Sequence, residues 1–464
     1  MIFFSKSTRT GRFLRTLVTS VAHLGAATLY TIFLIPLILR YENPEKLGLW
    51  LLISQLGTYL LMVDAGLSAL SIRQFVGLVS TNNFTKLAPR FRATWLISTI
   101  QGLIVILVGF TGSWFAALFQ ISGDLRDLFC HLFLAQCTLV GIGFPIRPFN
   151  SILLAKQVYD HNYLVNSLAL SVSFGLTWVG FHSGWGLWSI LAGNCFQVLI
   201  GAGLSWLGVA QFTRPTQLFR SREDWLGLIP QIFRESTAFA SGSLFATFGG
   251  LVQSAFLSRL FGLEGVAAWN VGSKIATALS QFMSKFFESS FAGLSELVEQ
   301  GRRDSATDRF LKILSYTATG TVVLACLILA GNNVFVEWWT KGQIHWPPSA
   351  TNAVAFWLVA ITLNRAFAVF SGVLLIWPCI RLSPVFDFIS LVLALSLAYF
   401  ARDFTLFVWC WAVTPLLAGM WIYIWGFFSV QIGLRDLACR RLAWLFWLAL
   451  GFFFFLMMLL SSRS

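Results

Sequence analysis

The chain contains the stretch RYENPEKLGLW at residues 40–50 and a related stretch, RLFGLEGVAAW, at residues 259–269. Both follow the pattern Arg-x4-Glu-x4-Trp, and each joins one long apolar run to another. The same offset of 219 residues relates four further pairs of apolar runs: 93–118 with 312–337, 126–152 with 345–371, 162–182 with 381–401, and 185–209 with 404–428. This regularity predicts two parallel repeats of membrane-spanning helices, an arrangement that transporters use.

Composition supports a membrane protein. Hydrophobic residues make up 57% of the chain and charged residues only 11%, and the mean hydropathy is +0.75. About 20 apolar residues cross a bilayer core of ~30 Å. The apolar runs therefore predict an all-α polytopic fold with helices near 17–39, 47–79, 93–118, 126–152, 162–182, 185–209, 236–260, 266–297, 312–333, 350–376, 382–400, 404–429 and 442–460.

These helices group into two pseudo-symmetric lobes of six, plus one extra helix. We expect an N-terminal lobe over 1–210, a C-terminal lobe over 236–430 and an additional membrane helix within 431–464. The segment 211–235 mixes apolar and basic residues, so it is interpreted as an amphipathic cytoplasmic helix that links the lobes.

The net charge of +13 is distributed as in a membrane protein, which argues against nucleic acid as a partner. If the N-terminus is cytoplasmic, the inner segments carry 20 Lys and Arg residues and the outer segments carry 7. This bias predicts a multi-pass membrane protein with a cytoplasmic N-terminus. The seven cysteines and five histidines are scattered without ligand spacing, so neither a metal site nor a cofactor is expected.

Charged residues inside the predicted helices are the main candidates for function. Each costs about 2.5–3.5 kcal/mol at a helix centre on insertion scales, so it needs a hydrated or paired position. Basic residues outnumber acidic ones among the eight charges: Asp64, Arg73, Arg147, Lys274, Lys285, Glu288, Arg365 and Asp387.

The predicted eighth helix carries the clearest polar face. At ~100° per residue, five side chains lie within about 40° of one line: Asn270, Lys274, Gln281, Lys285 and Glu288. Such a face indicates contact with water or substrate, although a local ion pair between Lys285 and Glu288 is an alternative.

The predicted second helix is the repeat partner of the eighth and places Gln55, Tyr59, Met62, Gly66 and Arg73 on one line. Both faces are therefore expected to line one central cavity. Asp64 points away from this line, and a helix break or an interhelical hydrogen bond is the favoured interpretation.

Arg147 and Arg365 occupy nearly equivalent positions in the two repeats. Arg147 lies between Pro145 and Pro148, and a snorkelling position near the cytoplasmic end is as plausible as a cavity position. Arg365 is the better cavity candidate, with Asp387 as a possible counter-ion.

Several short motifs give the chain a resemblance to a known family. They are Ile35-Pro36-Leu37, Arg40, Gly48-Leu49-Trp50, Asp64-Ala65-Gly66-Leu67 and Arg73. Together they resemble the opening of polysaccharide transporters, the O-antigen flippase family of the multidrug/oligosaccharidyl-lipid/polysaccharide (MOP) exporter superfamily. The Leu-Gly pair usual after the arginine is replaced by Tyr41-Glu42-Asn43-Pro44 here, whereas Phe261-Gly262 keeps it in the second half.

The resemblance implies a V-shaped, MATE-like bundle whose first, second, seventh and eighth helices line a cationic cavity. The implied cargo is an oligosaccharide on polyprenyl diphosphate, moved from the inner to the outer leaflet of a bacterial membrane. Glycan polymerases or glycosyltransferases are possible partners, besides membrane lipids. The substrate-binding candidates are Arg73, Lys274, Lys285, Arg365, Gln55, Gln281, Glu288 and Arg147, of which the basic ones suit a diphosphate.

Two matching halves suggest alternating access. Arg40 and Glu45 occupy one outer helix connection, and Arg259 and Glu264 occupy the equivalent one, so they are candidates for an outer gate. Local surface ion pairs that contribute little are the alternative.

Two other functions are considered. A cation-coupled drug or metabolite antiporter of the same superfamily commonly has an acidic residue in its first or seventh helix, but 17–39 and 236–258 contain none, and His23 is their one side chain that titrates near neutral pH. A membrane enzyme such as a glycan polymerase needs a large outer loop, and the longest here, 331–349, offers only Glu337, Lys341 and His345. No enzymatic activity is expected.

Overall fold

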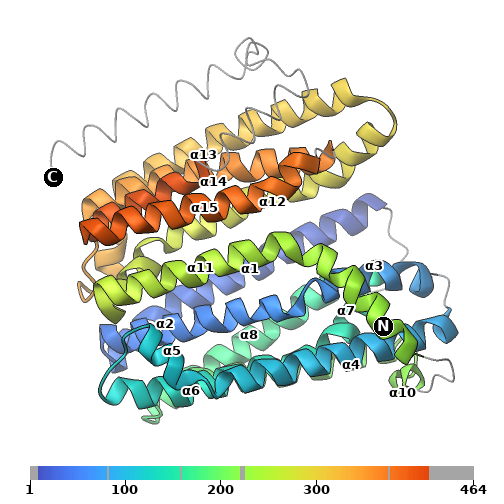
Figure 1. Ribbon diagram of the computed structural model, residues 1–464, viewed down its shortest axis with the longest axis horizontal. Helices are drawn as coiled ribbons and strands as arrows, with labels where there is room; N and C mark the ends of the chain where they lie inside the picture. The colour runs from blue at the N-terminus through green and yellow to red at the C-terminus, as the bar shows by residue number, and fades with distance from the viewer. Residues whose placement is uncertain (1–8, 81–82, 157–158, 220–224, 375–376, 417–464) are drawn as a thin grey trace. The chain divides into compact units, whose positions relative to one another are not determined.

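The computed structural model describes residues 9–80, 83–156, 159–219, 225–374 and 377–416. Throughout these ranges the regular structure is helical, without strands, which confirms the all-α prediction (Figure 1). The chain divides into two compact units, Met1–Thr247 and Phe248–Ser464.

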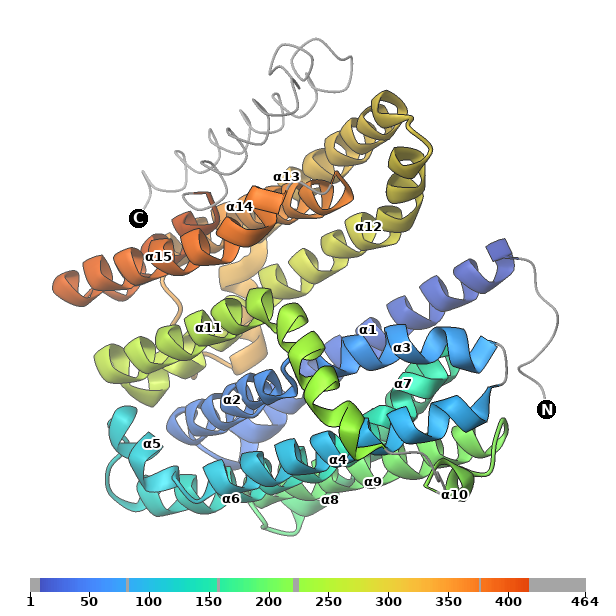
Figure 2. The same ribbon diagram turned by 45° about the vertical axis from the view of Figure 1, so that its right-hand side comes forward.

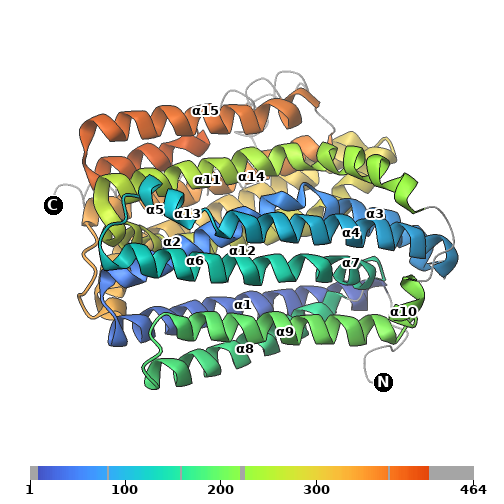
Figure 3. The same cartoon turned by 60° about the horizontal axis from the view of Figure 1, so that its bottom comes forward.

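The first unit contains most of the predicted N-terminal helices, several of them in segments. Their bounds are α1 Arg9–Tyr41, α2 Pro44–Tyr59, η1 Leu60–Asp64, α3 Leu67–Ser80, α4 Phe84–Gly109, α5 Gly112–Leu118, α6 Asp124–Gly143, η2 Phe144–Ile146, α7 Arg147–Ala155, α8 Tyr159–His182, α9 Trp188–Ala210, α10 Pro215–Leu218 and η3 Leu226–Leu228. Figure 3 shows α8 and α9 side by side, with α1 packed along α8.

The second unit begins within α11, Ile229–Gly272, which Gly262 interrupts with a non-helical backbone (φ 66°, ψ −171°). It continues with α12 Lys274–Glu299, α13 Arg303–Thr340, α14 Pro348–Val373, α15 Trp377–Ala401 and an apolar helix over Phe404–Leu416. Helices α12, α13 and α14 pack against one another (Figure 2). The predicted extra helix near 442–460 lies outside the described residues.

The second predicted helix is broken. Ala65 and Gly66 both adopt left-handed backbone angles (φ 47° and 75°), and the short 3-10 helix η1 precedes them. This confirms the helix break considered at Asp64, and the single run expected over 47–79 is two helices with a turn between them. Because a 3.6-residue period does not carry across this break, Gln55 on α2 and Arg73 on α3 do not share one helical face.

The linker region differs from the single amphipathic helix that was expected. Its described part forms α10, η3 and the first turns of α11. The Arg92 guanidinium lies 4.5 Å from the ring centre of Trp225, and Phe219 packs edge-on against Phe91 and Trp95. These aromatic contacts hold the linker against α4.

Eight helices in the described ranges are long and apolar enough to span a membrane, and three shorter apolar helices accompany them. The longest of the eight runs over Arg303–Thr340 with a mean hydropathy of 2.0. This content confirms a multi-pass membrane protein.

Close packing of α4 on α6 depends on two facing glycines. A Cβ atom built on Gly102 would clash with the backbone oxygen of Gly141, and one on Gly141 would lie 2.6 Å from the backbone oxygen of Gly102. We expect Gly102→Ala to lower the unfolding temperature in detergent, because the ~1–3 kcal/mol of overpacking exceeds the gain in helix propensity.

Gly175→Ala is the matched control, since a Cβ atom there meets nothing within 4 Å. It should leave the unfolding temperature unchanged or raise it. An unfolding temperature of Gly102→Ala at or above the wild-type value would contradict this account of the contact.

Candidate functional site

The predicted polar face of the eighth helix lies in the second unit, mainly on α12. Backbone hydrogen bonds from Ser273 N to Trp269 O (3.0 Å) and from Thr277 N to Ser273 O (2.9 Å) carry the helical ladder from α11 into α12. Lys274, Gln281 and Lys285 therefore remain on one face of the helix. Gln281 is exposed, and the two lysines are half-buried.

Asn270 and Glu288 are the other two members of the predicted face. Asn270 belongs to the end of α11, and its Nδ2 donates to Val266 O at 2.8 Å. The side chain of Glu288 lies outside the described residues, so the alternative of a Lys285–Glu288 ion pair stays a prediction.

Arg365 joins this region from α14. Its Nη1 donates to Ser284 Oγ at 2.6 Å and to Ser280 O at 3.3 Å, and both serines are buried on α12. Ser284 directly precedes Lys285 and points about 100° away from it around the helix, so the guanidinium is bound on the side of α12 that adjoins the lysine face. We call Lys274, Gln281 and Lys285, with Arg365 bonded on the adjoining Ser280–Ser284 side of the helix, the basic face of α12.

An apolar surface runs beside the basic face. Phe282 and Phe286 are 37% and 46% exposed, and their rings meet edge-to-face at 5.4 Å. On a helical wheel these rings lie about 80–120° from the lysines, opposite the packed side of Ser280 and Ser284. The helix therefore presents cationic and aromatic groups next to each other, which suits an amphiphile with an anionic head and an apolar tail.

Arg147 lies inside the first unit and is paired. Its Nη1 donates to Asp64 Oδ1 at 3.0 Å, and its guanidinium sits 3.9 Å from the ring centre of Phe144. Asp64 also accepts hydrogen bonds from the backbone N (3.1 Å) and Oγ (2.8 Å) of Ser68. Asp64 therefore combines both roles considered for it, since it caps α3 after the helix break and bonds to another helix.

The remaining first-unit candidates are dispersed. Gln55 is half-buried on α2, whereas Arg73 is exposed on α3, beyond the break at Ala65. The adjacent Gln74 donates through Nε2 to Glu235 at 3.0 Å. The break thus removes the expected alignment of Gln55 with Arg73, and their part in substrate binding stays a prediction.

The four gate candidates are all exposed at helix connections. Arg40 lies in the last turn of α1, with its guanidinium 5.8 Å from the ring centre of Tyr41. Glu45 lies in the first turn of α2. Beside it, Lys46 Nζ forms an ion pair with Glu42 Oε2 at 2.6 Å. Arg259 and Glu264 flank the non-helical Gly262 in α11. Their role as a gate stays a prediction.

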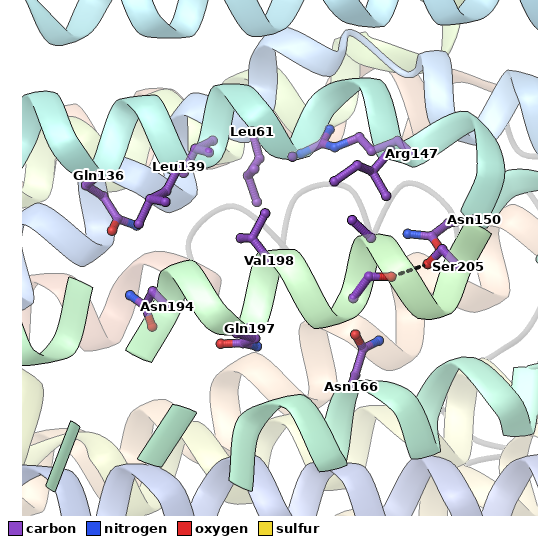
Figure 4. Close-up of a pocket in the computed structure, with 15 residues that line it drawn as sticks. Leu61, Gln136, Leu139, Arg147, Asn150, Asn166, Asn194, Gln197, Val198 and Ser205 are labelled. Carbon is purple, nitrogen blue, oxygen red and sulfur yellow. Dashed lines mark hydrogen bonds between the residues drawn. The ribbon is translucent and has the colours of Figure 1, made fainter. Parts of the chain in front are cut away.

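The structure also contains a pocket that none of the sequence predictions includes. It has a volume of about 390 Å³ and lies within the first unit, where α6 and α7 face α8 and α9 (Figure 4). Its polar lining consists of Gln136, Arg147, Asn150, Asn166, Asn194, Gln197 and Ser205.

A sequence signal for this pocket exists on α9. Asn194, Gln197, Gly201 and Ser205 are spaced by three or four residues and so share one helical face. A search restricted to charged residues passes over this face, because amides and small residues carry no charge.

Comparison with solved structures identifies proteins of similar fold. No family model matches the chain, and no curated protein matches it in sequence. A multidrug-resistance MATE transporter of the MOP superfamily in an inward-facing conformation aligns with a TM-score of 0.67 and 14% identity, over 87% of this chain and 94% of that one.

Two other solved structures are similar. A MOP-superfamily transporter from Pyrococcus furiosus gives a TM-score of 0.63 at 14% identity, covering 92% of this chain and 99% of its own. The lipid II flippase MurJ, in an inward-closed conformation, gives 0.62 at 12% identity, covering 96% and 98%. The chain therefore has the all-helical fold of MATE and other MOP-superfamily transporters.

Proposed function

We propose that the chain is a flippase that moves a polyprenyl-diphosphate-linked oligosaccharide from the cytoplasmic to the outer leaflet by alternating access. The observation that carries this proposal is the basic face of α12, where Arg365 bonds to Ser284 and Ser280 on the side that adjoins the two lysines. A diphosphate is attracted by several basic groups in a hydrated path. The exposed Phe282 and Phe286 alongside suit the isoprenoid part of the same cargo.

The charge pattern favours an anionic cargo over a cationic one. Helix α1 and residues 236–258 contain no Asp or Glu, so the carboxylates expected of cation-coupled antiporters are missing from the sequence there. His23, the one histidine in these positions, has its Nδ1 3.1 Å from Ser167 Oγ. The antiporter alternative is therefore the weaker candidate.

The structural neighbours allow both kinds of cargo within one fold. One of them is a lipid II flippase, and others are multidrug transporters. The Pyrococcus furiosus transporter is described as having a binding pocket of reversed polarity that suggests a different function. Pocket polarity thus differs among proteins of this fold, which supports using the charge of the basic face to choose the cargo.

The cellular setting follows from the same proposal. The excess of basic residues in the inner segments supports a cytoplasmic N-terminus in a bacterial inner membrane. A flippase for lipid-linked glycans would work between the glycosyltransferases that build its cargo and a polymerase that consumes it. Transport without chemical conversion is proposed, as in the transporters of this fold.

Reconstitution tests the proposal directly. Proteoliposomes with the full chain should move a fluorescently labelled polyprenyl-diphosphate oligosaccharide between leaflets, measured by the loss of protection from a membrane-impermeant quencher. Protein-free liposomes and the same lipid without its glycan are the controls. Uptake of a cationic drug without movement of the lipid would replace this proposal with the antiporter.

A further inference from the structure

The pocket of the first unit has a lining that is polar and has no net charge. Five of its side chains are amides, and Arg147 is the one charged group among its lining residues. The charge of Arg147 is balanced by Asp64, whose Oδ1 lies 3.0 Å from Nη1. An ion pair of this kind leaves little field to attract either a cation or an anion.

Few of the amide groups that line the pocket form hydrogen bonds with one another. Among the described lining residues, the hydrogen bond between side chains joins Ser205 Oγ to Asn150 Oδ1 at 2.6 Å, the dashed line in Figure 4. Amide groups that line a cavity can instead donate to and accept from a bound molecule.

The space in the pocket is open. A Cβ atom built on Gly201 or Gly143, both of which line it, would meet no heavy atom within 4 Å. The volume of about 390 Å³ falls within the range of ~300–1,000 Å³ that is common for small-molecule sites.

From this geometry we propose that the pocket binds a neutral pyranose, a hexose or an N-acetylhexosamine residue. Amides offer both donors and acceptors, which match ring hydroxyl and acetamido groups. Apolar side chains such as Leu61, Leu139 and Val198 line the same space and match the apolar face of a sugar ring. The assignment of this sugar to the glycan of the cargo rests on the proposed function, whereas the pocket chemistry does not.

Binding to the full chain in lipid nanodiscs tests the proposal. The probes are methyl β-glucoside and N-acetylglucosamine, with inorganic diphosphate and tetraphenylphosphonium as charged comparisons, detected by saturation-transfer NMR. We expect the neutral sugars to bind. Asn194→Leu/Gln197→Leu should weaken that binding at least tenfold, which corresponds to about 1.4 kcal/mol.

Two further variants separate binding from folding. Gly201→Leu places a side chain into open space, so it should abolish sugar binding while the unfolding temperature stays at or above the wild-type value. Gln211→Leu removes an exposed amide at the end of the same helix and should bind sugar normally. Sugar binding that is absent in the wild type, or equal in the pocket variants, would overturn the proposal, as would pocket-dependent binding of the cation.

The same samples distinguish the source of the sugar and the two proposals. Displacement of the soluble sugar by the lipid-linked oligosaccharide assigns the pocket to the cargo, and independent binding assigns it to a free saccharide; both outcomes support a saccharide site. Normal sugar binding in a protein that fails to move the lipid would refute the flippase alone.

Discussion

Replacing Lys274 and Lys285 together by alanine is expected to abolish transport of the lipid-linked oligosaccharide, while the protein still inserts at its normal level. Each lysine offers a charged contact to a diphosphate, and hydrogen bonds to charged groups contribute about 1.5–3 kcal/mol. Losing two such contacts predicts a reduction of roughly 100-fold or more in transport. The measurement is the leaflet-exchange rate in proteoliposomes, beside surface glycan in cells.

Matched variants show whether charge or location matters. Lys274→Arg/Lys285→Arg keeps the charge and should retain transport. Lys312→Ala/Lys341→Ala removes two exposed basic residues from α13 and its C-terminal end, away from the basic face, and should leave transport near the wild-type rate. Unchanged transport by the Lys274→Ala/Lys285→Ala protein would remove the basic face from the substrate path.

The helices themselves were largely predictable because the bilayer imposes a simple rule. Long apolar runs such as 162–182 and 185–209 correspond closely to α8 and α9. The breaks inside longer runs were harder to place. In the run 47–79, the hydropathy of Leu60 to Leu67 does not distinguish a regular helix from the 3-10 turn and left-handed residues found there.

The repeat predicts which positions of the two halves correspond, but not where the backbone conformations of the halves differ. The offset of 219 residues aligns Gly66 with Lys285. Gly66 has φ 75°, a conformation that costs a side-chain-bearing residue free energy, whereas Lys285 lies within the regular helix α12. The second unit therefore keeps a continuous polar face at the point where the first unit bends.

The spacing of residues in the sequence does not identify partners that lie far apart along the chain. Asp64 and Arg147 are 83 positions apart, and only the packing of α3 on α7 brings them within 3.0 Å. The amide pocket is similar, because its lining comes from α6, α7, α8 and α9 together. Helical periodicity identifies one face of one helix, but it does not say which other face lies opposite.

Removing Asp64 is expected to cause the largest loss of stability in the first unit. Asp64→Ala leaves the Arg147 guanidinium without its carboxylate and removes the cap that bonds Ser68 N at the start of α3. Breaking a buried pair costs about 3–5 kcal/mol, and the lower end applies because the side chains are 16% and 24% exposed. A cap contributes about 1 kcal/mol more. The unfolding midpoint in detergent should therefore fall well below that of Asp124→Ala, which removes an exposed carboxylate from α6.

A double-mutant cycle identifies the cause of this loss. Arg147→Met keeps an unbranched apolar stem and removes the charge, so the double variant Asp64→Ala/Arg147→Met buries no unpaired ion. If the ion pair dominates, the double variant should be more stable than Asp64→Ala alone, because residues in direct contact couple by about 0.5–3 kcal/mol. If the cap on α3 dominates, Arg147→Met should not restore stability, whereas Asp64→Asn, which keeps the acceptor for Ser68 N, should restore most of it. Strictly additive losses in the cycle would show that the contact at 3.0 Å contributes nothing to the stability of the first unit.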